Sequence, residues 1–444
     1  MLSKCFKVIS LVLVLSMLFA VVGCGAKTAS DQPAQKTEST EKAKPADKPA
    51  EKVKIKWAVW DYSLTADYKD IIEAFQKENP DITVEPLEMS NKGYDDKLTI
   101  MLAGGDETDV IAIKEMPAFS GYVAKKQLMQ LDDFIAKDKV DMAPFNGITE
   151  NIKIDGKLYD FPFRSDFWML YYNKDIFDKA KVAYPSDDMT FEQFRETAKK
   201  LTSGTGKDKT YGTFIHNWKS CIINWPVADK KGTLIDGKYD FIKPAYDIFL
   251  PMQKDDKSYM SFAEAKTSSA HYRGQFESGK VGMVIMGSWF VSSLINDKKD
   301  GKHNVNWGVT KAPHFNGSKP GTTFGNVTGN AINAKAKNPE AAWKFVKFMG
   351  TEAGATIMAK RGSMPAYRTK NVVDAYKGLQ GLPEGMDKAL ETASVALEFP
   401  PSKFSAALDK MLQEEHELIM IGKNDPDKGI ASMNKRAQEI MAGN

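Results

Sequence analysis

The sequence predicts an α/β fold, in which the strands of a largely parallel sheet are connected by helices. The first observation is the order strand, helix, strand, helix, strand between residues 53 and 113, which requires parallel pairing with helical crossovers. The second is the strongly apolar run at 168–172, which is typical of a buried strand. The third is that strands and helices continue to alternate further along the chain.

The first part of the chain shows this alternation most clearly. Val53, Ile55 and Trp57 alternate with lysines, which predicts a half-buried strand. Apolar residues at helical spacing then follow, and Asn79–Pro80 ends that helix. The expected elements are, in order, a strand from 53, a helix over 65–79, a strand over 81–89, a helix over 94–105 and a strand over 109–113.

The middle and the end of the chain extend the pattern. Thr190 is the expected N-cap of a helix over 190–201, and the run 280–290 contains an apolar strand. Pro339 stands at the first position of a helix that closes at Gly350. The last sixty residues are predicted to be helical throughout.

Composition favours a soluble globular protein with a large core. The chain has 444 residues, of which 42% are hydrophobic and 27% are charged. The 61 basic and 58 acidic residues nearly balance, which argues against nucleic acid or an anionic membrane face as the main partner.

The N-terminus has the features of an export signal. Lys4 and Lys7 precede an apolar run over 8–22, which is shorter than the ~20 residues of a membrane-spanning helix. The run ends in "VVGC", which resembles the bacterial lipobox. We therefore expect residues 1–23 to be a lipoprotein signal peptide and Cys24 to become the lipid-bearing first residue. Residues 24–52 lack the apolar content to fold and are expected to form a disordered tether.

No catalytic, metal or cofactor site is indicated. The five histidines show neither ligand spacing nor a nearby nucleophile motif. Cys5 lies in the signal and Cys24 is the proposed anchor, so Cys221 has no partner for a disulfide and is expected to be a small buried hydrophobe.

Aromatic and charged side chains follow several predicted strands, where ligands bind in open α/β sheets. Trp60 and Asp61 follow the first strand, and Glu115 follows the third. Sugars present C–H faces that pack on aromatic rings, together with hydroxyls that need carboxylate, amide or guanidinium partners. The candidate ligand-binding residues from this reasoning are Trp60, Asp61, Glu115, Arg164, Asp166, Trp168, His216, Asn217, Trp218 and Trp289.

Arg164 and Asp166 stand at the head of the apolar run. They are two residues apart and so share one face if the backbone is extended. Two roles are open for Arg164: contact with the ligand, or neutralisation of Asp166.

Four stretches carry a family resemblance: "LAGGDETDVI" (102–111), "MLYYNKDIF" (169–177), "FESGKVGMVIMGSW" (276–289) and "AINAKAKNPEAAWKFVKFM" (331–349). Their order and spacing resemble those of the family-1 extracellular solute-binding proteins, which are the receptors of bacterial ABC importers. The resemblance covers nearly all of residues 53–444 and points in particular to the maltodextrin-binding member of that family.

The resemblance implies a two-lobed periplasmic-binding-protein fold of type II, with the ligand cleft between the lobes. Lobe 1 is expected to comprise residues 53–165 and 327–378. Lobe 2 is expected to comprise residues 166–326 and the C-terminal helices of 379–444.

The resemblance also implies roles for individual residues. Asp166 matches a ligand-binding carboxylate of the maltodextrin receptor, and Trp289 matches the ring on which a sugar stacks. Trp60 and Asp61 match a loop that binds ligand hydroxyls, and Phe404 lies at or beside another stacking position. The chain departs from that receptor at Ile113, Ser220 and Ile222, where the receptor has a tryptophan, a carboxylate and a tyrosine, so the resemblance does not fix the sugar.

The function expected from this resemblance is that of a non-enzymatic receptor. It would capture a sugar or oligosaccharide outside the cytoplasm and deliver it to ABC permease subunits. It would act as a monomer, held at the outer face of the membrane only by lipidated Cys24. The alternatives are a receptor for a polyamine or other small solute, a lipid-anchored glycoside hydrolase using Asp61 and Asp166, and a sensor or adhesion protein with the same fold.

Overall fold

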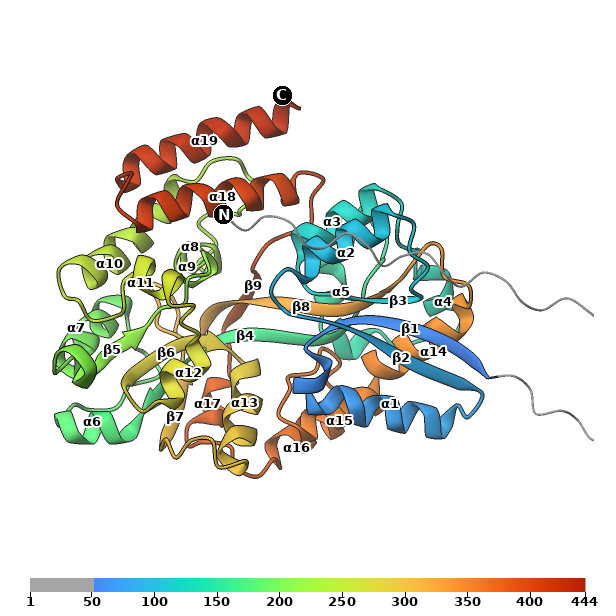
Figure 1. Ribbon diagram of the computed structural model, residues 1–444, viewed down its shortest axis with the longest axis horizontal. Coiled ribbons are helices and arrows are strands. Elements are labelled where there is room, and N and C mark those ends of the chain that lie inside the picture. The colour runs from blue at the N-terminus through green and yellow to red at the C-terminus, as the bar shows by residue number, and fades with distance from the viewer. Residues whose placement is uncertain (1–51, 444) are drawn as a thin grey trace, which may run out of the picture. The chain divides into compact units, whose positions relative to one another are not determined.

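The structure is a computed structural model that describes residues 52–443 (Figure 1). The expected signal peptide and the lipidated Cys24 lie outside the described residues, as does nearly all of the expected tether. Among the described helices, none combines the length and apolar character needed to cross a membrane. Cys221 is buried and unpaired, as predicted.

The described residues form one nine-stranded sheet path. Its strands are β1 (Val53–Trp60), β2 (Ile82–Met89), β3 (Val110–Ile113), β4 (Phe161–Asn173), β5 (Tyr211–Phe214), β6 (Val281–Gly287), β7 (Trp307–Lys311), β8 (Thr322–Ile332) and β9 (Ser394–Leu397). The order along the path is β2-β1-β3-β8-β4-β6-β5, with β7 paired to β4 and β9 paired to β8. The predicted α/β class is confirmed, but the sheet is mixed and not largely parallel. The pairs β1–β2, β1–β3, β5–β6 and β8–β9 are parallel, whereas β8 pairs antiparallel with β3 and β4, and β4 pairs antiparallel with β6 and β7.

The long strand β4 connects two halves of this path. Residues 161–167 of β4 pair antiparallel with β8, whose other neighbour β3 leads to β1 and β2. From Trp168 onward β4 pairs instead with β6 and β7. Arg164 and Asp166 therefore precede the point at which the strand changes partners. The chain is extended there, as the prediction required.

Helices connect and cover these strands (Figure 1). In the first part of the chain they are the 3-10 helix η1 (Tyr62–Leu64), α1 (Ala66–Glu78), α2 (Tyr94–Ala103), α3 (Met116–Ala124), α4 (Asp132–Lys137), η2 (Ala143–Phe145) and α5 (Ile148–Asn151). Helix α1 packs on β2, and α14 (Pro339–Gly350) packs on β1, β4 and β8. Trp57 of β1 and Trp343 of α14 are buried in this region.

The second part of the chain is richer in short helices. Between β4 and β8 lie α6 (Lys174–Ala180), α7 (Phe191–Leu201), η3 (Gly206–Asp208), α8 (Ser220–Ile223), α9 (Trp225–Ala228), η4 (Asp240–Ile242), α10 (Lys243–Lys254), α11 (Phe262–Thr267), α12 (Tyr272–Glu277) and α13 (Trp289–Lys299). The predicted N-cap Thr190 is confirmed: its hydroxyl accepts from Gln193 N, and the Gln193 side chain accepts from Thr190 N.

The prediction of a wholly helical C-terminus is wrong at one place. The helices are α15 (Glu352–Lys360), α16 (Lys370–Lys377), α17 (Met386–Ala389), α18 (Ser405–Met420) and α19 (Pro426–Ala442). Between α17 and α18 the chain forms β9, which pairs parallel with β8 from Thr322 to Gly325. The strand conformation of β9 is stabilised by backbone hydrogen bonds to β8, which is distant in the sequence. The local sequence pattern therefore does not predict it. After β9, α18 packs against α3 and α19.

Candidate functional site

Six aromatic side chains gather at one end of the β4–β6 pair. We call them the aromatic cluster: Trp168, His216, Trp218, His271, Tyr272 and Trp289. Trp168 lies on β4, Trp289 opens α13 directly after β6, and Tyr272 opens α12. The other members come from the segments that follow β5 and precede α12. The cluster therefore joins chain segments that lie far apart in the sequence.

Trp218 and His271 are the exposed members of the aromatic cluster. Trp218 is 37% exposed, whereas His216 behind it is only 7% exposed. The two rings stack with centroids 4.3 Å apart and an interplanar angle of 9°. His271 meets His216 edge-on at 5.3 Å. This arrangement holds the indole of Trp218 rigid while one side of it stays in solvent.

Trp168 forms the buried floor of the cluster. It is 1% exposed and lies edge-on to Trp218 at 6.4 Å and to Trp289 at 5.8 Å. Phe324 of β8 and Trp225 of α9 pack on it from behind. Trp168 therefore supports the two more accessible indoles.

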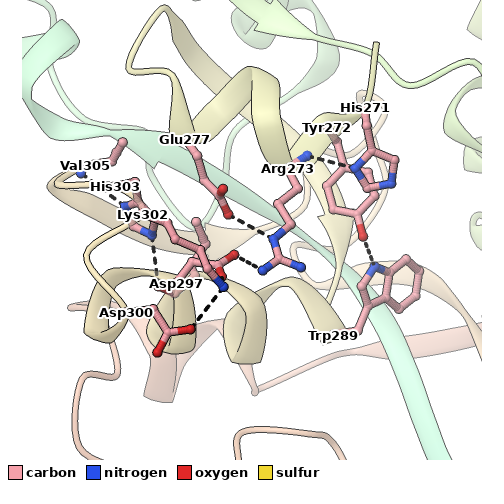
Figure 2. Close-up of polar contacts among 11 residues, drawn as sticks. His271, Tyr272, Arg273, Glu277, Trp289, Asp297, Asp300, Lys302, His303 and Val305 are labelled. Atoms are coloured by element: carbon pink, nitrogen blue, oxygen red, sulfur yellow. Dashed lines mark hydrogen bonds and ion pairs between the residues drawn. The ribbon is translucent and has the colours of Figure 1, made fainter. Parts of the chain in front are cut away.

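Trp289 is half-buried, and its position is fixed by neighbours (Figure 2). Its Nε1 donates a hydrogen bond of 3.1 Å to the hydroxyl of Tyr272. The indole also lies over Gly287, where a Cβ would overlap the ring. The indole can occupy this position only because residue 287, the glycine of the "GSW" sequence, has no side chain.

The protein environment disfavours the charged form of both imidazoles of the cluster, because it lowers the pKa of each. Burial lowers the pKa of His216 to about 4. His271 is exposed, yet the surrounding protein desolvates it in part and so lowers its pKa; the charge of Arg273 also lowers it, and the Asp61 carboxylate raises it. The cluster therefore offers apolar faces without positive charge.

A group of acidic side chains borders the cluster through Lys219 and Ser220, which follow Trp218. We call it the acidic cluster: Asp95, Glu115, Glu398 and Asp409, with Lys114 and Lys219 between them. Lys219 pairs with Asp409 at 2.5 Å, and Lys114 lies 3.8 Å from Glu115. Four carboxyl groups face two ammonium groups, so the acids are in excess.

Glu115 and Glu398 are two members of this cluster whose pKa values are raised by desolvation. Glu115 has 47% of its side chain exposed, yet the surrounding protein desolvates it enough to raise its pKa. Desolvation and the Glu115 charge raise the pKa of Glu398 to about 7, against a hydrogen bond from Ser220. Backbone contacts fix Glu398, since its N–H donates to Gly325 O at 2.7 Å.

Asp61 is held in an unusual backbone conformation. Its φ is 47°, in the left-handed region, and its Oδ1 accepts the N–H of Asn91 at 2.9 Å. Trp60 before it is 6% exposed and packs edge-on against Tyr94 at 5.2 Å. Since β1 and β3 are parallel, their carboxyl ends bring Asp61 and Glu115 to the same edge of the sheet.

The Arg164–Asp166 pair is largely buried. Arg164 Nε lies 2.8 Å from Asp166 Oδ2, and the Ser288 hydroxyl donates to Asp166 Oδ1 at 2.6 Å. Asp166 is 2% exposed. Desolvation raises its pKa, which Arg164 and Ser288 oppose. Arg164 therefore neutralises Asp166 in this structure, which was one of the two roles left open.

The structure brings together some of the candidates from the sequence and not others. Trp168, Trp218 and Trp289 share the aromatic cluster, and Asn217 lies beside His216, whose Nδ1 accepts its N–H at 2.7 Å. Trp60 packs on Tyr94, and Phe404 lies under the ammonium group of Lys403, 4.8 Å from its ring centroid. No ring contact joins either of these two to the aromatic cluster within residues 52–443.

Sequence reasoning missed His271, Tyr272 and Glu398. His271 and Tyr272 sit in a loop-to-helix segment without a motif. Glu398 follows β9, which had been expected to be helical. Ligands in open α/β sheets bind beyond the carboxyl ends of strands, which we call the strand-end rule. Had β9 been recognised as a strand, this rule would have identified Glu398 as a candidate.

Other features of the described residues do not add to this site. No three His, Cys, Asp or Glu side chains within 52–443 are placed to hold a metal ion. A surface hollow of ≈ 630 Å³ lies at the C-terminal end of β4 and is lined by, among others, Asn173, Lys179, Lys200 and Glu277. Its lining mixes charged side chains with aliphatic ones such as Ile176 and Leu201, and contains no aromatic side chain.

A family described as bacterial extracellular solute-binding protein matches residues 62–356 of this chain. A sugar transporter from Rhizobium etli, solved in an open conformation, is 40% identical and has a TM-score of 0.74. The match covers 87% of this chain and 99% of that one.

Two further proteins are similar over most of their length. A solute-binding protein from Listeria monocytogenes, solved with cycloalternan, is 24% identical with a TM-score of 0.77. The match covers 88% of this chain and 99% of that one. A maltooligosaccharide ABC transporter solute-binding lipoprotein from Streptococcus pneumoniae is 25% identical over 393 residues, which are 82% of this chain and 84% of the relative.

Proposed function

This chain belongs to the bacterial extracellular solute-binding protein family, and from that premise we propose that it is the receptor of an ABC importer for a sugar or oligosaccharide. It captures the ligand outside the cytoplasm and delivers it to the permease subunits. The family consists of binding proteins, and we assign no catalytic activity to this member. Similar proteins that bind maltooligosaccharide or cycloalternan support a carbohydrate ligand.

The observation that carries the proposal is the aromatic cluster with carboxyl groups at its border. Trp218 offers an exposed ring face, and Trp289 is half-buried beside it, 6.4 Å away at an angle of 61°. Neutral rings suit the C–H faces of a sugar, and the carboxyl groups of Glu115 and Glu398 suit its hydroxyls. The neutral imidazoles add apolar surface without attracting anions.

We extend this proposal to individual contacts. Trp218 and Trp289 provide the stacking faces, and Asp61, Glu115 and Asn217 provide hydrogen bonds. Trp168 supports the rings from below, while Arg164 and Asp166 hold the strand that carries it. Trp60 and Phe404 remain proposed contacts that lie outside the aromatic cluster.

Ligand binding is proposed to favour a closed arrangement of the two halves of the sheet path. The proposed contacts come from both halves, with Asp61 and Glu115 after β1 and β3 and the indoles around β4 and β6. A ligand that touches both halves only when they close shifts the equilibrium by its difference in affinity for the two states.

We propose that the mature protein is a monomer attached to the outer face of the membrane through lipidated Cys24. Residues 24–52 would form the tether that gives the folded part its reach. The lipobox-like sequence ending at Cys24 supports this, as does the lipoprotein name of the Streptococcus pneumoniae relative.

A glycoside hydrolase would need two carboxyl groups about 5–10 Å apart with free access to a glycosidic bond. Asp166, one member of the pair considered from the sequence, has both oxygens engaged by Arg164 and Ser288. Incubation with maltotriose and a reducing-end assay tests this directly. New reducing ends would replace the receptor proposal with a hydrolytic one.

The test of the proposed function is a thermal-shift screen of the purified protein against glucose, maltotriose, cycloalternan, spermidine and a set of amino acids. A ligand at about 100 times its dissociation constant adds about 2.7 kcal/mol of stability, which shifts the midpoint clearly. A rise with one class of sugar supports the proposal. A rise with spermidine alone would assign the acidic cluster, and not the aromatic cluster, as the ligand-selecting feature.

A further inference from the structure

We propose that Tyr272 is a positioning residue for Trp289, and that an ion-pair network between α12 and α13 holds Tyr272 in place. The inference rests on the proposed role of Trp289 as a ligand-contacting ring. Tyr272 and the residues of the network would affect ligand binding only by fixing the position of the Trp289 ring. Figure 2 shows the indole, the tyrosine and the network together.

The contact between the two rings is specific. The Trp289 N–H donates to the Tyr272 hydroxyl at 3.1 Å, and the Tyr272 ring packs edge-on against Phe290 at 5.0 Å. Tyr272 is 7% exposed, so its hydroxyl faces protein more than water. Rotation of the half-buried indole away from the cluster would leave a buried acceptor without this partner, which costs free energy.

The next residue in the chain, Arg273, ties α12 to α13. Its guanidinium pairs with Asp297 on α13 and with Glu277 on its own helix, where Nε lies 3.3 Å from Oε1 (Figure 2). Asp297 is 1% exposed and also accepts from Lys302 Nζ at 2.9 Å. Trp289 and Asp297 lie on the same helix, and Tyr272 and Arg273 are neighbours on the other.

The network matters because α12 has only six residues. So short a helix is not stable on its own, and its position depends on tertiary contacts. With Arg273 anchored to Asp297, the start of α12 is fixed relative to α13. From the same end of α12, the Tyr272 hydroxyl then meets the indole of Trp289 at the first residue of α13.

A purely structural role would give the same contacts without any effect on the ring. The two explanations differ in what removal of one oxygen atom does. If Tyr272 positions Trp289, loss of its hydroxyl changes the indole and the ligand affinity. If it only fills space, the phenylalanine ring serves equally well.

The experiment uses the full chain labelled with ¹⁵N at the tryptophan indoles. The Trp289 resonance is identified by its loss in Trp289→Phe. In Tyr272→Phe we expect this resonance to move upfield and its proton to exchange faster with solvent. The affinity for the strongest-binding sugar among glucose, maltotriose and cycloalternan should fall about threefold to tenfold, the usual effect of one hydrogen bond.

A double-mutant cycle separates positioning from stability. In the Trp289→Phe background, Tyr272→Phe should leave affinity unchanged, because the ring then has no N–H to hold. Tyr259→Phe is the matched control, since it removes another buried tyrosine hydroxyl, which donates to Phe249 O at 3.0 Å. It should leave the Trp289 resonance in place.

The network is tested with two variants of unequal expected effect. Asp297→Asn weakens the link to Arg273 and should shift the Trp289 resonance in the same direction as Tyr272→Phe. Lys302→Met removes the other cation on Asp297 without touching α12, and should shift it much less. Equal shifts in the two variants would refute the anchoring role of Arg273.

Two other outcomes are distinguishable. An unchanged Trp289 resonance in Tyr272→Phe overturns this inference whatever the ligand. An affinity that Trp289→Ala leaves unchanged for every sugar tested overturns the proposed ligand contact of Trp289. In that case the resonance still reports whether Tyr272 positions the ring.

Discussion

The hydroxyl of Ser288 donates a hydrogen bond of 2.6 Å to Oδ1 of Asp166. It joins the strand that connects the two halves of the sheet path to the residue directly before Trp289. The other oxygen of Asp166 lies 2.8 Å from Arg164 Nε. Arg164 and Asp166 thus stabilise the part of β4 that carries Trp168, the buried indole against which Trp218 and Trp289 pack.

Removing Asp166 should destabilise the protein strongly. Asp166→Ala leaves the guanidinium of Arg164 largely buried without its carboxylate, and we expect the free energy of unfolding to fall by about 3 kcal/mol in urea titrations. Glu340→Ala is the control, because it breaks the exposed pair with Lys137 and should change stability by less than about 1 kcal/mol. Similar losses in both variants would contradict a special role for the buried pair.

The alternation of strands and helices could be predicted because the sequence pattern of each element favours the same conformation that the folded protein adopts there. Thr190 has the capping box expected of a helix start, and Val53, Ile55 and Trp57 mark the strand β1. Strand β9 could not be predicted in the same way. Its residues are half-buried or exposed, and their extended conformation depends on pairing with β8.

The candidate site was predictable only in part, for a related reason. Trp289 and Glu115 follow strands whose apolar runs are visible in the sequence, so the strand-end rule finds them. Tyr272 has no such signal, because its place beside Trp289 depends on how α12 packs on α13. Glu398 was hidden because the strand before it was not recognised.

The ionisation of Glu277 should make stability depend on pH. Burial, and the hydrogen bond and charge of Asp297, raise the pKa of Glu277 from 4.5 to about 7, while Arg273 opposes the shift. Ionisation is therefore costlier in the folded state, so the stabilisation is full below about pH 4.5 and is lost as the pH rises to 7.

Glu277→Gln should remove this dependence. We expect the variant to gain on the order of 1–3 kcal/mol relative to the parent between pH 4.5 and pH 7.5, measured as the difference between their urea unfolding curves. The difference between the two proteins isolates Glu277 from Glu398 and Asp95, whose pKa values are also raised to about 7. Parallel stability curves across this range would contradict the assignment.

Trp218 should contribute to ligand affinity through its exposed face. Trp218→Ala removes a ring that is 37% exposed and stacked on His216, and we expect a loss of about tenfold in sugar affinity by isothermal titration calorimetry. His216→Phe keeps a flat ring behind the indole and should retain most of the affinity.

An exposed aromatic elsewhere supplies the comparison. Tyr184 is 42% exposed and contacts Tyr172 and Phe177, away from the aromatic cluster. Tyr184→Ala should leave sugar affinity unchanged. A loss in Tyr184→Ala as large as in Trp218→Ala would mean that general loosening of the fold, and not stacking, lowers affinity.

Gly287 should be intolerant of a side chain because of the ring it carries. A Cβ at this position would overlap the Trp289 indole, so Gly287→Ala must displace the ring. We expect an affinity loss of about tenfold, comparable with that of Trp289→Ala, while the circular dichroism of the fold is preserved. Gly274→Ala is the matched control: it lies in α12, a Cβ there meets nothing within 4 Å, and the helix should gain up to about 1 kcal/mol. Affinity unchanged in Gly287→Ala would show that the indole can move without cost, and that its position does not set ligand binding.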